Sequence, residues 1–163
     1  MAVDFFLKID GIEGEAKVAG HENEIQLDSW SAGLTQSGTT HRGKGSGSGK
    51  VNFQDVTFTK LVDKSTTPLM QACATGRHIE KIVLTCRKAG GGDKPLDYLK
   101  ITLNTCLISS HQMGGSAGGD DTVSESVTIN FGKVEYKYVP QKDDGSSEGE
   151  VVAGYNIMTN EKV

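Results

Sequence analysis

The chain has 163 residues, of which 36% are hydrophobic, and its formal net charge is −4 at pH 7. This length and apolar content predict a single domain over residues 1–163 with a substantial hydrophobic core. No more than three apolar residues follow one another, which excludes a transmembrane helix. The acidic balance argues against a dedicated nucleic-acid-binding protein.

The amino-terminal segment predicts a β-strand over residues 3–9, where apolar side chains alternate up to a glycine turn at residues 11–14. This segment has neither a basic start nor a continuous apolar stretch, so we expect no cleaved secretory signal. Farther along, the chain again alternates with period two, but the apolar set changes parity at three points. These points lie near residues 28–29, near residues 54–55 and at Gly132, and each predicts a β-bulge.

A long loop is predicted over residues 35–49, which contain no large apolar side chain. It carries His41, Arg42 and Lys44 and is followed by Lys50, so it cannot pack on an apolar core of its own and is available to a partner. Its sequence is close to a phosphate-binding loop, but that motif needs a following helix, and a β-strand is predicted there instead. We therefore interpret it as a flexible basic loop.

One short helix is predicted after this strand. We expect Thr67 at the N-cap, Pro68 at the first helical position and Gly76 at the left-handed exit. A helix this short is not stable alone, so its apolar face must pack against the rest of the protein. That face consists of Leu69, Met70 and Cys73.

Further strands are predicted after the helix, over residues 82–86, 99–107, 127–138 and 151–158. The second of these is the most regular, and its apolar face consists of Leu99, Ile101, Leu103 and Leu107. Strands that bend at bulges are typical of barrels and tightly curled sandwiches, where closure also hides the sheet edges. We therefore predict a mainly β fold, an antiparallel β-barrel or curled sandwich with one short α-helix packed on its side.

The three cysteines are widely spaced and odd in number, which is typical of reduced thiols in a cytoplasmic protein. Cys73 lies on the apolar helix face and Cys86 shares the parity of apolar neighbours, so both are expected in the core. Cys106 lies on the more polar phase of its strand and is expected to react first. No close ligand pair such as C-x-x-C is present, so we expect no metal site and no cofactor.

Ser116 lies in a literal G-x-S-x-G sequence, but that nucleophile motif needs a following helix and a later histidine. All four histidines precede it, and a strand follows, so a glycine-rich turn is the better interpretation. The carboxylate pairs Asp120–Asp121 and Asp143–Asp144 stand beside glycines without apolar neighbours, as solvated loop charges do. No set of nucleophile, base and orienting group is found, and we expect that the protein is not an enzyme.

Several short segments follow one another along nearly the whole chain: LKIDGIEGE, SWSAG, KVNFQD, FTKLVDKST, PLMQACATG, RHI, CRKAGG and GYNI. In their order and spacing they resemble the haemolysin-coregulated protein (Hcp) family, the tube subunits of type VI secretion systems. The resemblance implies a small β-barrel with a helix at its side and homohexameric rings that stack into a tube. It also implies a contractile sheath, a spike protein and effector cargo in the lumen as partners, with neither nucleic acid nor membrane insertion.

By this resemblance the protein is cytoplasmic and is then secreted through the type VI apparatus without a cleaved signal. The resemblance also implies that the loop at 35–49 contributes to ring stacking. The candidate stacking residues are Gln36, Ser37, His41, Arg42, Lys44 and Lys50. Our hypothesis is that they meet Asp120, Asp121, Asp143 and Asp144 of the next ring. The alternative is that these charges only keep the loop soluble, because exposed ion pairs contribute ~0–1 kcal/mol each.

Two other functions remain open from the sequence. One is a phage-like tail-tube protein of the same architecture, and the other is a β-barrel ligand-binding or hydrolytic module. Rings of purified protein would favour either tube, whereas monomers would favour the module.

Overall fold

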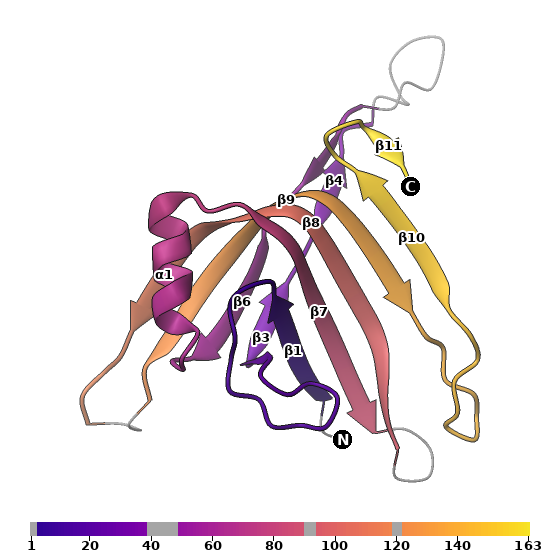
Figure 1. Ribbon diagram of the computed structural model, residues 1–163. Helices are drawn as coiled ribbons and strands as arrows, with labels where there is room; N and C mark the ends of the chain where they lie inside the picture. The colour runs from indigo at the N-terminus through magenta and orange to yellow at the C-terminus, as the bar shows by residue number, and fades with distance from the viewer. Residues whose placement is uncertain (1–2, 39–48, 90–93, 119–121) are drawn as a thin grey trace.

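A computed structural model of the chain describes residues 3–38, 49–89, 94–118 and 122–163 (Figure 1). The strands of the main sheet are β1 (Val3–Ile9), β2 (Ile25–Leu27), β3 (Ser29–Ser31), β6 (Val56–Leu61), β7 (Ile79–Ala89), β8 (Pro95–Gly114), β9 (Ser124–Tyr138), β10 (Val151–Asn156) and β11 (Glu161–Lys162). Strands β4 (Leu34–Gln36) and β5 (Val51–Phe53) pair only with each other, and the described helix is α1 (Thr66–Thr75).

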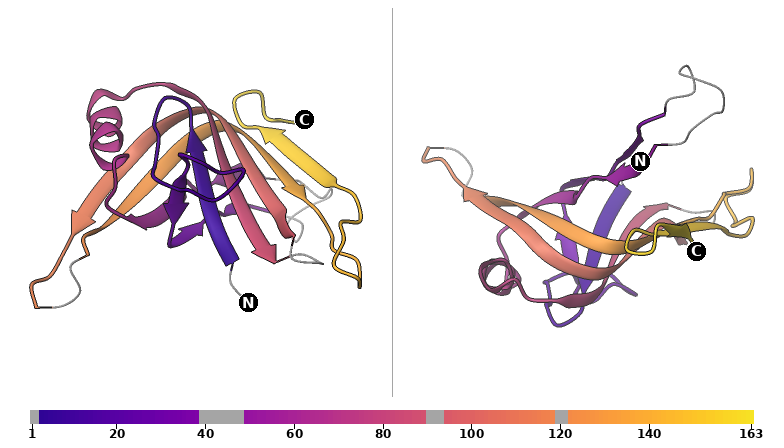
Figure 2. Two further views of the ribbon diagram at one scale, coloured as in Figure 1. Left: turned by 60° about the horizontal axis from the view of Figure 1, so that its bottom comes forward. Right: turned by 90° about the horizontal axis from the view of Figure 1, so that it is seen from above.

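The main sheet is antiparallel and closes on itself. Its strands follow the order β11-β10-β9-β8-β7-β1-β2, and β9 pairs in addition with β6, which pairs with β3. Residues 124–129 of β9 lie against β6, whereas residues 133–138 lie against β10. The Asp28 backbone N–H donates to the Thr59 carbonyl at 2.9 Å and so links the end of β2 to β6. The predicted antiparallel β-barrel with one short helix at its side is confirmed (Figures 1 and 2).

The core lies inside this closed sheet and consists of the inward side chains of its strands together with one face of the helix. Its largest fully buried apolar side chains are Leu7, Ile25, Phe58, Leu69, Ile79, Ile82, Leu84, Leu103, Ile108 and Ile129. Burial of apolar area of this kind is the main favourable contribution to folding.

Two of the predicted bulges are breaks between strands. Near residue 28 the chain leaves β2, which pairs with β1, and enters β3, which pairs with β6. Near residues 54–55 it leaves β5 and enters β6, so the long strand expected there is two strands in two sheets. Near residues 54–55 the chain passes from the two-stranded sheet into the main sheet, whereas β2 and β3 belong to the same sheet and pair with different strands.

The change of parity at Gly132 occurs without a shift of register. Phe131 and Val134 are both buried, and the pairing with β8 keeps one register on both sides of the glycine. Opposite Gly132, Thr105 has a left-handed backbone with φ 56°, so both strands turn over together. The register of this pair shifts instead between Ile108 and Ser110.

This turnover reverses the faces predicted for the end of β8. Cys106 is 1% exposed and packs in the core, whereas Leu107 is 38% exposed. The expectation that Cys106 lies on the polar face and Leu107 on the apolar face was therefore wrong. A β-branched residue with positive φ is rare, so the alternation of apolar residues gave no sign of the kink.

The helix begins two residues earlier than expected, at Thr66 instead of Pro68, and Thr67 is not its cap. Ser65 occupies the N-cap position but has helical angles, and its hydroxyl contacts the Asp63 carboxylate instead of the helix. Gly76 has the predicted left-handed backbone, with φ 63°. The buried helix face contains Leu69 and Ala72, with Cys73 half-buried, whereas Met70 is 52% exposed, so its predicted burial was wrong. In the described part of the chain, no helix has both the length and the apolar character needed to cross a bilayer.

Candidate assembly surfaces

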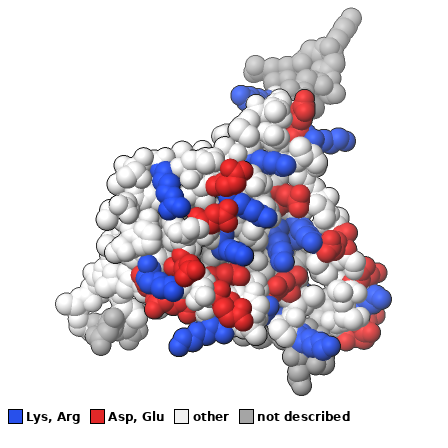
Figure 3. All heavy atoms as spheres, in the orientation of Figure 1, with Lys and Arg blue, Asp and Glu red and all other residues white. Residues whose placement is uncertain are grey.

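Strands β4 and β5 form an arm that projects from the barrel (Figure 1). Gln36 closes this pair opposite Val51, and Gln36, Ser37 and Lys50 are all exposed at its outer end. The other candidate stacking residues, His41, Arg42 and Lys44, lie outside the described residues. The arm therefore presents polar groups away from the barrel. On the face of the molecule drawn in Figure 3, charged side chains gather at the centre and on the right.

Asp143 and Asp144 lie at the opposite end of the molecule from the arm, in the loop between β9 and β10 (Figure 1). Both are exposed. The hydroxyl and backbone N–H of Ser146 donate to the Asp144 carboxylate and hold the pKa of Asp144 below its usual range. The proposed counterparts Asp120 and Asp121 lie outside the described residues. The structure thus places Lys50 and Asp143 at opposite ends of one subunit, where only another copy can bring them together.

A buried ion cluster that the sequence analysis missed joins the strands to the start of the helix. Lys60 is fully buried and forms an ion pair with the equally buried Glu125. The Lys60 ammonium also donates to the Asp63 carboxylate at 2.8 Å and to the Leu61 carbonyl at 3.1 Å. The second Glu125 oxygen lies 2.9 Å from Nε2 of His111. Each buried charge is therefore partnered, as burial in a low dielectric requires.

The same cluster replaces a conventional helix cap. Burial raises the pKa of Asp63, but hydrogen bonds from Lys60 and Ser65 outweigh it and leave that pKa below its usual range. The Thr66 hydroxyl lies 3.0 Å from the Asp63 backbone N–H and 3.2 Å from a Glu125 oxygen. The alternation of inward and outward positions along the two strands could have revealed this cluster from the sequence. Lys60 follows the inward positions of β6, and Glu125 precedes those of β9, so both were placed to face the core.

A second polar cluster holds the loop between β1 and β2 against the barrel. The two ring nitrogens of His21 lie 2.9 Å from the Glu24 carboxylate and 3.0 Å from that of Asp97. The ring stacks on Phe6 with centroids 4.5 Å apart, and Arg87 donates to Asp97 at 2.7 Å. These partners outweigh the effect of burial and keep the pKa of Asp97 below its usual range.

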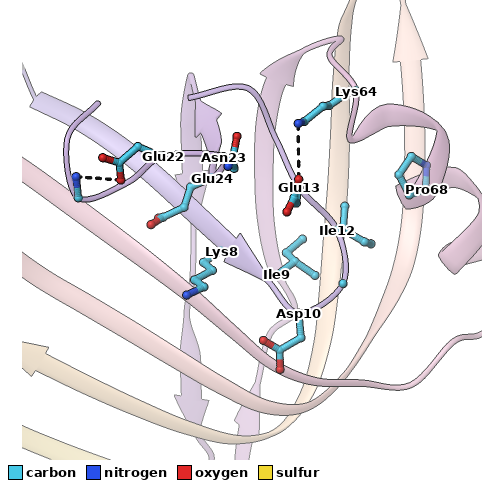
Figure 4. A pocket seen from close by; sticks show the side chains of 12 residues that line it. Lys8, Ile9, Asp10, Ile12, Glu13, Glu22, Asn23, Glu24, Lys64 and Pro68 are labelled. Atoms are coloured by element: carbon cyan, nitrogen blue, oxygen red, sulfur yellow. Dashed lines mark hydrogen bonds and ion pairs between the residues drawn. The ribbon is translucent and has the colours of Figure 1, made fainter. Parts of the chain in front are cut away.

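A hollow of about 730 Å³ lies between that loop and the start of the helix (Figure 4). Its lining is Lys8, Ile9, Asp10, Gly11, Ile12, Glu13, Gly20, Glu22, Asn23, Glu24, Lys64 and Pro68. Among these described residues there is no serine, threonine, cysteine or histidine to act as nucleophile or base. Glu13 and Lys64 form an exposed pair at 3.6 Å, and Glu24 is engaged with His21. The hollow is a solvated surface of mixed charge.

The fold places the chain among the small β-barrel proteins of type VI secretion. It superimposes with a TM-score of 0.93 on a structure described as a type six secretion system protein, at 25% identity and covering 99% of this chain and 100% of that one. With Hcp1 from Salmonella typhimurium the TM-score is 0.82 at 36% identity, and both chains are covered completely.

Sequence comparison identifies the family. A family model described as type VI secretion system effector, Hcp, matches residues 6–138. Protein hcp1 of Pseudomonas aeruginosa is 50% identical over 161 residues, which span 98% of each chain. The chain belongs to the Hcp family, whose members are secreted through the type VI system, and it is a structural subunit of the type VI secretion tube. Of the three functions that the sequence left open, the comparisons support the type VI tube subunit.

Proposed function

We propose that the chain forms homohexameric rings, that these rings stack head to tail into the tube, and that the lumen carries effector cargo. The observation that supports stacking is the separation of the two candidate surfaces. The arm with Gln36, Ser37 and Lys50 lies at one end of the subunit, and Asp143 and Asp144 lie at the other. Two different surfaces at opposite ends give a heterologous contact that repeats along an axis.

The proposal includes the partners and the route of the protein. The subunit assembles in the cytoplasm inside the contractile sheath, carries the spike protein at its tip, and leaves the cell without a cleaved signal. Its role in this process is structural and not enzymatic. Its polar clusters support that role, because Lys60, Glu125 and His21 are engaged in ion pairs that fix loops and a helix to the barrel.

Sedimentation velocity together with negative-stain microscopy tests the proposal. Purified protein is expected to sediment at about six times the 17.4 kDa subunit mass and to appear as rings. Because subunits in a ring meet through apolar surfaces, the ring should persist when salt is raised. A protein that remains monomeric at micromolar concentration would contradict the hexamer.

A further inference from the structure

An apolar groove lies where the arm meets β9 and β10. Leu34 and Phe53 of the arm form one wall, and Tyr136 and Ala153 form the other, around a space of about 180 Å³. The Phe53 ring stacks on Tyr155 at its base, with centroids 5.6 Å apart. Leu34 is 50% exposed and Tyr136 is 36% exposed, so the groove opens to the surface.

The apolar surface continues beyond the groove along the same face of the sheet. Tyr138 pairs with Val151 just as Tyr136 pairs with Ala153, so all four side chains share one face. Tyr138 is 44% exposed and Val151 is 62% exposed. From residue 151 to residue 160 the chain has no Lys, Arg, Asp or Glu. A partner that covers this face therefore buries no charged group from this segment.

The size and chemistry of the groove indicate what fills it. Sites for small organic molecules usually enclose ~300–1,000 Å³ and place several polar groups around the ligand. This groove is smaller, at about 180 Å³, and apart from Tyr136 and Tyr155 its lining side chains are aliphatic or phenyl. Apolar side chains projecting from another protein surface fit it better.

The opposite end of the molecule carries such side chains. Where β8 ends and β9 begins, Met113 is 58% exposed and Val123 is 39% exposed. The end of β6 lies beside them, because the Val62 N–H donates to the Val123 carbonyl at 3.0 Å, and Leu61 and Val62 are 46% and 42% exposed. We call these four residues the apolar tip. Both views of Figure 2 place the β8–β9 end and the β10 side at opposite ends of the molecule.

None of the four tip residues is charged, but charged residues flank them in the sequence. Asp120 and Asp121 lie between Met113 and Val123, and Asp63 and Lys64 follow Val62. In Figure 3 the described residues at the left edge of the face, where β8 ends and β9 begins in Figure 1, are mostly uncharged. Contact between the tip and the groove would remove apolar area from water, which favours association.

We propose that the apolar tip of one subunit, led by Met113 and Val123, packs into the groove of the next subunit around the ring. This inference rests on the proposed ring and specifies which surfaces close it. A ring of identical subunits needs two complementary patches on different sides of each copy, and the tip and groove meet that requirement. Because each copy uses both patches, every subunit in a closed ring has its tip and its groove covered.

Cysteine cross-linking tests the contact directly. In a Cys73→Ser background, Leu34→Cys or Tyr136→Cys is combined with Met113→Cys or Val123→Cys, and mild oxidation is followed by non-reducing electrophoresis. At least one pair is expected to give a ladder of covalent oligomers that ends at six subunits, because disulfides form only between closely spaced residues. Leu34→Cys combined with Met70→Cys is the matched control, since Met70 is 52% exposed on the helix and away from the tip.

Charge substitution gives an independent readout. Met113→Glu should raise the concentration at which rings dissociate by about tenfold or more, and a Leu34→Lys partner substitution should restore much of the loss. Met70→Glu should leave rings unchanged, and far-ultraviolet circular dichroism checks that each variant is folded. Wild-type rings with no cross-link from any pair and no effect of Met113→Glu would overturn this contact and leave the hexamer standing. A wild-type protein without rings would overturn both.

Discussion

At the scale of single residues, the three cysteines differ in burial. Burial raises the pKa of Cys86 to about 11 and that of Cys106 to about 12, whereas Cys73 is half-buried on the helix. Because the thiolate is the reactive form, a thiol reagent should label Cys73 first in the native protein. The other two should react only after denaturant is added. Mass spectrometry of labelled peptides checks the order, and Cys73→Ser should abolish the fast phase.

Replacing Lys60 should lower the free energy of unfolding strongly. Removing it leaves Glu125 charged and buried, and breaking such a pair typically costs ~3–5 kcal/mol. We expect Lys60→Met to lower the free energy of unfolding by that order and the double variant Lys60→Met/Glu125→Leu to recover part of it. Lys64→Met is the control, because Lys64 is half-exposed and should change stability by ~0–1 kcal/mol. Urea unfolding at one subunit concentration measures all three, and equal losses for Lys60 and Lys64 would contradict the burial argument.

Asp97 makes stability depend on acid pH. Burial raises its pKa, but the hydrogen bonds from Arg87 and His21 outweigh this and lower the folded-state value. The stabilisation that Asp97 contributes is therefore complete at pH values above its pKa in the unfolded chain, about 3.9. It is lost as the pH falls toward the pKa of Asp97 in the folded protein. Asp97→Asn should lower stability at neutral pH and flatten its decline below about pH 4. Thermal midpoints measured across this range check the slope, and parallel curves for the two proteins would show that Asp97 is not responsible.

At the scale of elements, the helix depends on packing and not on a side-chain cap. Leu69 is fully buried, so Leu69→Ala should cost ~2–5 kcal/mol. Thr67 and Met70 are exposed, so Thr67→Ala and Met70→Ala should each change stability by about 0.5 kcal/mol or less. Chemical denaturation of the three variants measures the difference. A large loss for Thr67→Ala would restore the capping role that the structure assigns elsewhere.

At the scale of the whole molecule, ring formation and ring stacking should respond differently to charge. The variant Arg42→Ala/Lys44→Ala/Lys50→Ala removes the basic groups of the loop, which contains no large apolar residue. We expect hexamers to remain while longer stacks and secretion decrease. Raising salt from ~50 to ~500 mM should shorten wild-type stacks, because screening increases with ionic strength. Microscopy measures stack length, and a variant that stacks and secretes like the wild type would leave the charges with only a solubilising role.

The sequence by itself determined what depends on neighbouring residues. Alternation of apolar residues is local, and it predicted the strands, the barrel class and the places where the chain turns over. The left-handed exit at Gly76 was predictable because glycine adopts positive φ without steric cost. The order of short motifs predicted the Hcp family. The role of the stacking residues stays a prediction, and half of them lie outside the described residues.

Only the tertiary structure decided features that depend on residues far apart in the chain. Lys60 and Glu125 meet across two strands, and the sequence analysis missed this ion pair although strand parity offered a signal; the His21–Asp97 contact spans 76 residues. The positive φ of Thr105 placed Cys106 inside, although local preference disfavours that backbone for threonine. The apolar tip and groove likewise depend on which strands end together. Such features follow from the pairing of distant strands, because burial and closure of the sheet outweigh local preferences of a kilocalorie or so.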